Sequence, residues 1–296
     1  MPKPRALVPL VTPFRTVLRS RSGAWTAICV GVVAALLVSW PLLWAPGASA
    51  EPSCTDTWTG PSAGDWATAA DWSSGVPGST DVACIPAGST VEVTAGSNQA
   101  VAVDGEGALV LSGGSLELSG DTSPSSIASL TLAGGTLSGP GTVHVSGSFS
   151  WSAGQMSGSG KTVIDTGATG SINPGGSGSV TMNERELVNA GTLTWSTGSV
   201  YGGYGARIDN VGTFKANSQD PSNNWFSTGL LRGAGAAPLL LNTGTLVKSA
   251  GNGLSVIQFA TENDGIIENA DAEGQLSFTG GHSRNPRERF LDRAGE

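Results

Sequence analysis

One five-residue pattern recurs in this chain: Asn189-Ala190-Gly191-Thr192-Leu193, Asn210-Val211-Gly212-Thr213-Phe214 and Asn242-Thr243-Gly244-Thr245-Leu246, with Asn263-Asp264-Gly265-Ile266-Ile267 as a degenerate copy. Successive copies are 21, 32 and 21 residues apart, so an insertion of about eleven residues interrupts the longest interval. Repeats of about 20 residues are typical of solenoids, in which each coil packs only against its neighbours.

The residue types in the pattern suggest how one coil is built. Glycine adopts the positive φ that a corner requires, and the following Thr-Leu or Thr-Phe begins a short strand whose side chains alternate between inside and outside. Stacked asparagines are expected to form a ladder of amide hydrogen bonds between coils. Related units lie further upstream: Gly113-Gly114-Ser115-Leu116, Gly134-Gly135-Thr136-Leu137 and Ala153-Gly154-Gln155-Met156.

The first fifty residues differ from the rest of the chain. Residues 1–23 contain five basic and no acidic residues, an apolar stretch follows to about Trp44, and the segment ends in Ala48-Ser49-Ala50. These are the three parts of a secretory signal peptide, with cleavage predicted after Ala50. The alternative is an uncleaved membrane anchor, because about twenty apolar residues can span a bilayer.

Export agrees with the use of cysteine. After loss of the signal peptide the chain retains Cys54 and Cys84, and an even pair in an exported protein predicts a disulfide. A metal site is the competing interpretation, but two cysteines with only His144 and His282 available do not match zinc spacing. We therefore expect a disulfide, no metal and no cofactor.

Three tryptophans lie between the cysteines, at Trp58, Trp66 and Trp72. One hypothesis is that these residues, together with Trp225 in the inserted stretch, present exposed rings to a sugar. The alternative is that the first three fill the end of a β stack, where no neighbouring coil exists. The segment resembles the opening of bacterial surface proteins that continue into β-solenoids, with Asp71-Trp72, Gly75-Val76-Pro77 and Asp81-Val82-Ala83-Cys84-Ile85 as its quoted motifs.

The glycine-rich repeats resemble those of bacterial parallel β-helix surface proteins, and the Asn-x-Gly-Thr units resemble adhesin and autotransporter-passenger stalks. The predicted fold is all-β: a right-handed parallel β-helix or solenoid with an N-terminal Trp-rich disulfide cap, preceded by a signal peptide helix. The predicted domains are a signal peptide at 1–50, a cap at 51–87, solenoid repeats at 88–281 and a basic, disordered tail at 282–296. A truncated end, with end-to-end self-association, is the other interpretation of the tail.

Charge limits the possible partners. Residues 51–296 contain ten basic and 23 acidic residues, which argues against nucleic acid and anionic membranes as partners. The membrane is expected to be contacted only through an uncleaved signal segment. Between residues 51 and 280 the basic residues are scattered singly, and the densest charge cluster, Glu184-Arg185-Glu186, is interpreted as a solvated edge. His144 is expected to point outward without a partner.

These observations predict an exported, extracellular or cell-surface protein without catalytic residues. Its expected role is adhesion or envelope attachment, with a glycan or a surface protein as ligand. Parallel β-helices also include polysaccharide lyases and hydrolases, so a polysaccharide-degrading enzyme is the alternative. That chemistry needs clustered carboxylates, or carboxylates with basic residues or calcium, on one face, and the sequence does not show such a cluster.

Overall fold

The structure is a computed structural model that describes residues 53–218, 228–251, 253–270, 274–284 and 289–292. The chain divides into two compact units, Met1–Gly47 and Ala48–Glu296, and all described residues belong to the second. The predicted signal peptide, its cleavage after Ala50 and the alternative anchor lie outside the described residues. Within them, no helix is long and apolar enough to span a membrane.

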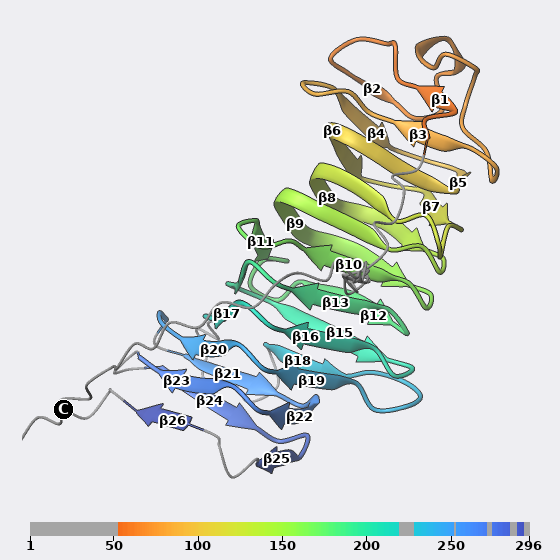
Figure 1. Ribbon diagram of the computed structural model, residues 1–296. Coiled ribbons are helices and arrows are strands. Elements are labelled where there is room, and N and C mark those ends of the chain that lie inside the picture. The colour runs from red at the N-terminus through yellow and green to blue at the C-terminus, as the bar shows by residue number, and fades with distance from the viewer. Residues whose placement is uncertain (1–52, 219–227, 252, 271–273, 285–288, 293–296) are drawn as a thin grey trace, which may run out of the picture. The chain divides into compact units, whose positions relative to one another are not determined.

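The second unit is a parallel β-solenoid of about nine turns, which confirms the predicted fold class. A full turn passes over three faces, and every ladder between described strands is parallel (Figure 1). Strand β6 (Ala102–Leu111) spans faces 1 and 2, while β8 (Ser125–Ser138) and β9 (Val143–Ser157) run around all three. The only helical element described is a 3-10 turn at Ala69–Asp71.

The remaining strands are shorter and fall on one face each. Face 1 comprises β1 (Asp56–Thr57), β3 (Val82–Cys84), β10 (Lys161–Ile164), β13 (Glu186–Asn189), β16 (Arg207–Asn210), β19 (Leu239–Asn242), β22 (Ala260–Asn263) and β25 (His282–Arg284). Face 2 comprises β2 (Ala63–Asp65), β4 (Thr90–Val93), β11 (Thr169–Ile172), β14 (Thr192–Trp195), β17 (Thr213–Ala216), β20 (Thr245–Lys248), β23 (Ile266–Asn269) and β26 (Arg289–Asp292). Face 3 comprises β5 (Ser97–Ala100), β7 (Ser115–Leu118), β12 (Ser179–Asn183), β15 (Ser199–Gly203), β18 (Gly229–Arg232), β21 (Leu254–Ile257) and β24 (Gln275–Phe278).

The core is a set of apolar columns that run through the stack. In a typical strand such as β14 the first and third residues are partly exposed and the second and fourth are buried, because side chains alternate across a strand. The ladder register then places each buried residue on its counterpart in the next coil. One such column on face 2 is Val91, Leu109, Leu130, Phe149, Gly170, Leu193, Phe214, Leu246 and Ile267.

The predicted asparagine ladder is present inside the corner between faces 1 and 2. The Nδ2 atom of Asn189 donates to Oδ1 of Asn210 at 2.7 Å, Asn210 donates to Asn242 at 2.6 Å, and Asn242 donates to Asn263 at 2.6 Å. All four side chains are buried, and a buried amide is stable only when it is hydrogen-bonded. The ladder therefore confirms the alignment of the repeats, including the pair that is 32 residues apart.

The glycine of each Asn-x-Gly unit is required for a different reason from the predicted positive φ. Gly114, Gly135 and Gly154 in the upstream repeats have positive φ, as expected, but Gly191 and Gly212 do not. A Cβ atom at either of these two positions would lie under 3.0 Å from a backbone carbonyl oxygen of the preceding coil. Glycine is required there because adjacent coils approach too closely for any side chain.

Arg185 lies inside the stack, so its interpretation as part of a solvated edge is wrong. Its side chain is fully buried at the corner between faces 3 and 1, where burial lowers its pKa to about 10 and leaves it charged at neutral pH. Nε donates to Oγ1 of Thr162 at 3.0 Å. The terminal nitrogens donate at 2.9–3.3 Å to the backbone carbonyls of Gly139, Gly141, Ser157 and Lys161. One cation thus ties three successive corners together.

Strand pairing continues beyond residue 281, where the repeats were predicted to end. Strand β25 pairs with β22 and β26 pairs with β23, both in parallel register. Residues 282–284 and 289–292 therefore extend the ladders of faces 1 and 2 instead of forming an entirely disordered tail.

Candidate binding pocket at the corner after β18

The three tryptophans of the N-terminal segment are buried, so the hypothesis that they present exposed rings to a sugar is wrong and the alternative, burial at the end of the stack, agrees with the structure. Trp58, Trp66 and Trp72 are 2%, 0% and 4% exposed. Trp72 contacts each of the other two edge-on, with ring centroids 5.1 Å apart. Its Nε1 donates to the carbonyl of Trp66 at 2.8 Å, and Nε1 of Trp58 donates to the carbonyl of Pro61 at 2.8 Å. Their packing agrees with the alternative in which they fill the first coil.

The other tryptophan predicted to bind a sugar, Trp225, lies outside the described residues, and its role stays a prediction. Trp151 and Trp195 are fully buried and belong to the apolar core. Aromatic stacking on the described tryptophans is therefore not available to a ligand.

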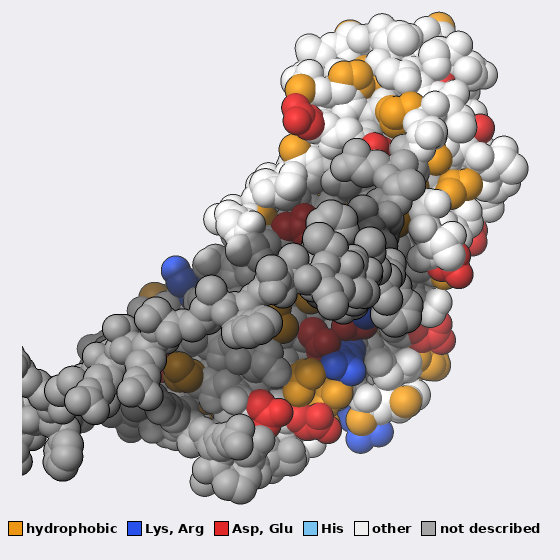
Figure 2. Space-filling model, in the orientation of Figure 1, with side chains coloured by type: hydrophobic (Ala, Val, Ile, Leu, Met, Phe, Trp, Pro, Cys, Tyr) orange, Lys and Arg blue, Asp and Glu red, His pale blue; other side chains and the backbone are white. Residues whose placement is uncertain are grey.

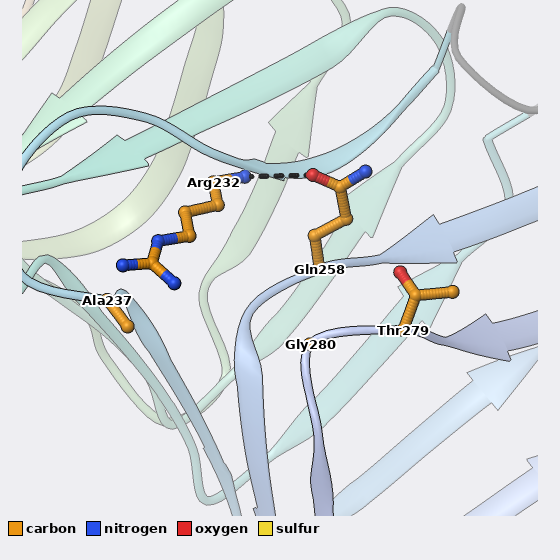
Figure 3. Close-up of a pocket in the computed structure, with 5 residues that line it drawn as sticks. All are labelled: Arg232, Ala237, Gln258, Thr279 and Gly280. Carbon is orange, nitrogen blue, oxygen red and sulfur yellow. Dashed lines mark hydrogen bonds between the residues drawn. The ribbon is translucent and has the colours of Figure 1, made fainter.

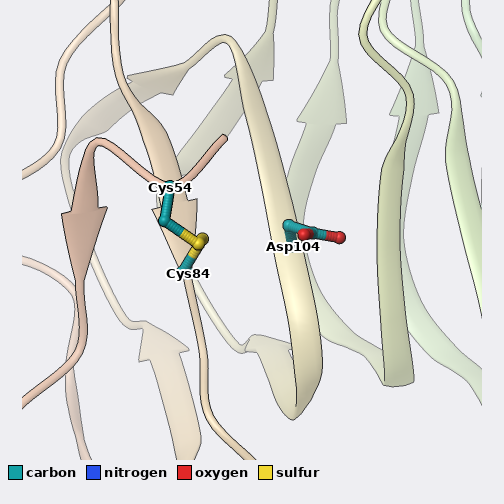
Figure 4. Close-up of side chains that lie close together, drawn as sticks. All are labelled: Cys54, Cys84 and Asp104. Carbon is teal, nitrogen blue, oxygen red and sulfur yellow. A yellow bond between two sulfur atoms is a disulfide. The ribbon is translucent and has the colours of Figure 1, made fainter. Parts of the chain in front are cut away.

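The disulfide between Cys54 and Cys84 is confirmed, with Cα atoms 5.7 Å apart. It ties the chain ahead of β1 to β3, and Asp104 of the next coil lies close to the two sulfurs (Figure 4). Metal ligation requires thiolates, and sulfurs joined in a disulfide cannot supply them. The disulfide therefore crosslinks the first coils, and the cluster does not act as a metal site.

His144 has a partner that the sequence did not predict. Its Nδ1 lies 2.9 Å from Oδ1 of Asp165 in the next coil, and both side chains are partly exposed. Asp165 lies just after β10, so the pair forms where two coils stack. The pair is a contact between the surfaces of two neighbouring coils.

A pocket of about 380 Å³ lies at the corner between faces 3 and 1. Arg232 ends β18, Gln258 follows β21, and Thr279 follows β24, so the lining comes from three successive coils. Ala237 and Gly280 complete the lining. Figure 3 shows the Arg232 side chain extending toward Ala237, while the amide oxygen of Gln258 accepts the backbone N–H of Arg232 at 3.3 Å.

The pocket exists because the corner after β18 is enlarged. Three residues connect β15 to β16, whereas Gly233–Pro238 connect β18 to β19. The longer loop is held by backbone hydrogen bonds to the coil above: Gly233 N–H to Gly202 at 2.7 Å, Tyr204 N–H to Ala234 at 2.8 Å and Gly205 N–H to Ala236 at 3.0 Å. These bonds fix the loop that forms one wall of the pocket.

Arg232 differs in its surroundings from most basic residues of the stack. Lys161 pairs with Glu186 at 2.8 Å and Arg207 pairs with Asp209, while Arg185 and Lys248 are buried and hydrogen-bonded. The exposed Arg232 side chain has no acidic partner among the described residues. Figure 2 shows that, on the face it presents, acidic side chains are spread along the stack and basic ones are few.

Two exposed aromatic rings lie beside this corner. Tyr204 is 54% exposed, and its ring lies against Gly235 of the enlarged loop, where a Cβ would be only 2.6 Å from the ring. Tyr201, 40% exposed, pairs with Leu231 next to Arg232. Tyr204 also has a φ of 53°, a conformation that is uncommon for any residue other than glycine and that is often found at functional sites.

The sequence alone does not indicate this pocket. Arg232 is one of the scattered basic residues, and Tyr201 and Tyr204 belong to none of the repeated motifs. The available signal was the 32-residue interval, because part of its extra length lies in Gly233–Pro238, immediately after the arginine. No family model, curated protein or solved structure matches the chain, so the site is interpreted from its own chemistry.

Proposed function

We propose that this chain is an exported, non-catalytic binding module that attaches to a cell surface or envelope component through the outside of its solenoid. The observation that carries the proposal is the open corner pocket, which combines a guanidinium that has no acidic partner among the described residues with amide and hydroxyl groups, on a stack held by parallel ladders. Such a scaffold presents its surface groups in fixed positions, which lowers the entropic cost of binding.

The chemistry of the pocket favours binding over catalysis. Glycoside hydrolysis uses a pair of carboxyl groups, one as acid and one as base or nucleophile, whereas the pocket is lined by arginine, alanine, glutamine, threonine and glycine. These groups can hold a polar ligand but do not supply that pair. A polysaccharide-degrading enzyme remains the competing proposal, and it predicts a measurable product.

One experiment separates the two proposals. The exported protein is incubated with insoluble plant and microbial polysaccharides and with intact cells, and the bound fraction and the released reducing or unsaturated sugars are measured together. We expect retention without product release, with heat-denatured protein as the control. Product release that increases with enzyme concentration would favour the enzyme, and absence of retention on every surface would reject the attachment proposal.

A further inference from the structure

We propose that the corner pocket binds the carboxylate of an acidic sugar unit, a uronate, with Arg232 as the anion-binding group. This inference rests on the proposed attachment function and names the chemistry of its ligand. It is carried by the Arg232 guanidinium, which has no acidic partner among the described residues, by Gln258 and Thr279 in the same lining, and by the exposed Tyr204 of the preceding coil, whose ring lies against the enlarged loop.

Charge is the first step of the argument. Residues 51–296 contain ten basic and 23 acidic residues, yet Arg232 has no acidic partner among the described residues. An anion reaching Arg232 does not have to break an ion pair among the described residues. The planar guanidinium matches a carboxylate with two parallel N–H···O bonds, which are stronger and more directional than neutral hydrogen bonds.

The other lining groups indicate a sugar as the carrier of that carboxylate. A volume of about 380 Å³ lies in the range of small-molecule pockets and is large enough for one sugar unit. Gln258 supplies an amide and Thr279 a hydroxyl, which are the groups that pair with ring hydroxyls. Outside the lining, the exposed Tyr204 ring lies against Gly235 of the enlarged loop and offers an apolar face with a polar edge, suited to the mixed surface of a sugar ring.

The pocket is preorganised, so binding does not require a new loop conformation. Backbone hydrogen bonds hold Gly233, Ala234 and Ala236 against the coil above, and Gln258 is fixed by its bond to the Arg232 backbone. A rigid, open corner also accepts one unit of a long chain while the rest of the polymer continues along the surface.

The test uses the exported protein and three probes: a trimer of galacturonate, the neutral trimer of galactose and a glutamate-rich peptide of similar charge. Dissociation constants are measured by calorimetry for the wild type and for Arg232→Gln, Arg232→Lys and Lys215→Gln. Lys215 is the matched control because it is a partly exposed cation on face 2, away from the pocket lining. Circular dichroism and denaturation midpoints confirm that each variant folds.

We expect the galacturonate trimer to bind, and Arg232→Gln to weaken it by about tenfold to a hundredfold, the range for a charge-assisted hydrogen-bonded pair. Arg232→Lys should lie between wild type and Arg232→Gln, because it keeps the charge but loses the planar fork. Lys215→Gln should stay within about twofold of wild type, since loss of a distant charge is screened by salt.

The possible failures are distinguishable. Equal binding of neutral and acidic trimers, unchanged by Arg232→Gln, would overturn the uronate assignment and leave glycan attachment intact. Binding of the peptide alone, lost in Arg232→Gln, would also overturn it and make the ligand an acidic protein segment. If none of the probes binds while the protein is still retained on cells, this inference is wrong and the attachment proposal stands; loss of both rejects both.

Discussion

Replacement of Asn210 by alanine tests whether the asparagine ladder holds adjacent coils together. The Asn210 amide donates to Oδ1 of Asn242 and to the carbonyl of Thr245, and accepts from Asn189. Alanine removes these three bonds in a buried site and leaves the acceptors on Asn242 and Thr245 without this donor. A net hydrogen bond contributes about 1 kcal/mol and an unsatisfied buried group costs about 1–3 kcal/mol, so we expect a loss of roughly 3–5 kcal/mol.

Asn189→Ala is the matched comparison, because Asn189 is the first member of the ladder. Its Oδ1 is buried without a partner, and its Nδ2 makes two bonds. Removing an unsatisfied atom together with two bonds should cost about 1–2 kcal/mol, less than at Asn210. Urea unfolding gives both values when the m-value is unchanged. The reasoning is refuted if Asn210→Ala costs no more than Asn189→Ala, or if both are neutral.

Three further predictions concern the same stack. Gly212→Ala would push a Cβ into the preceding coil and should lower the unfolding free energy by about 2 kcal/mol or more, as overpacking does. The control is Gly176→Ala, whose Cβ meets nothing within 4 Å and which should change stability by less than about 1 kcal/mol. Equal urea midpoints for the two variants would contradict the argument that adjacent coils approach closely at Gly212. Arg185→Ala should cost about 3–5 kcal/mol in urea unfolding, because buried carbonyls lose their donor, and a neutral result would mean that water replaces the guanidinium. Replacing Cys54 and Cys84 together by serine should lower the unfolding free energy by about 3–4 kcal/mol, as expected for a closed loop of 30 residues; a reduced wild type that unfolds at the oxidised midpoint would refute this.

The fold was predictable because its signals are local and repeated. Alternation in segments such as Thr192–Trp195 predicts a half-buried strand, and the spacing of Asn189, Asn210 and Asn242 predicts which strands stack. The same reasoning was wrong about why Gly191 is a glycine, because it expected a positive φ at the corner. A short distance to the preceding coil also requires glycine, and the sequence alone does not separate these two causes. Only the stacked structure shows that the carbonyl of the neighbouring coil occupies the space.

The candidate site was harder to predict because it depends on contacts between coils that are far apart in sequence. Arg232, Gln258 and Thr279 are separated by more than twenty residues each, and none belongs to a motif. Trp58, Trp66 and Trp72 looked like binding residues because aromatic rings serve both cores and sugar sites. Burial distinguishes the two roles. Here the rings are buried because the first coil has no preceding coil among the described residues to cover its apolar interior, and the sequence does not show this directly.

The position of the pocket follows from how a solenoid absorbs extra residues. Asn210 and Asn242 are 32 residues apart yet remain paired through the ladder, so the insertion leaves the register of faces 1 and 2 unchanged. The extra length must therefore leave the stack at corners, between β17 and β18 and in Gly233–Pro238. Because each coil contacts only its neighbours, such an insertion costs the rest of the stack little. The enlarged corner then creates a hollow beside Arg232, and the regular ladders on either side keep that hollow open.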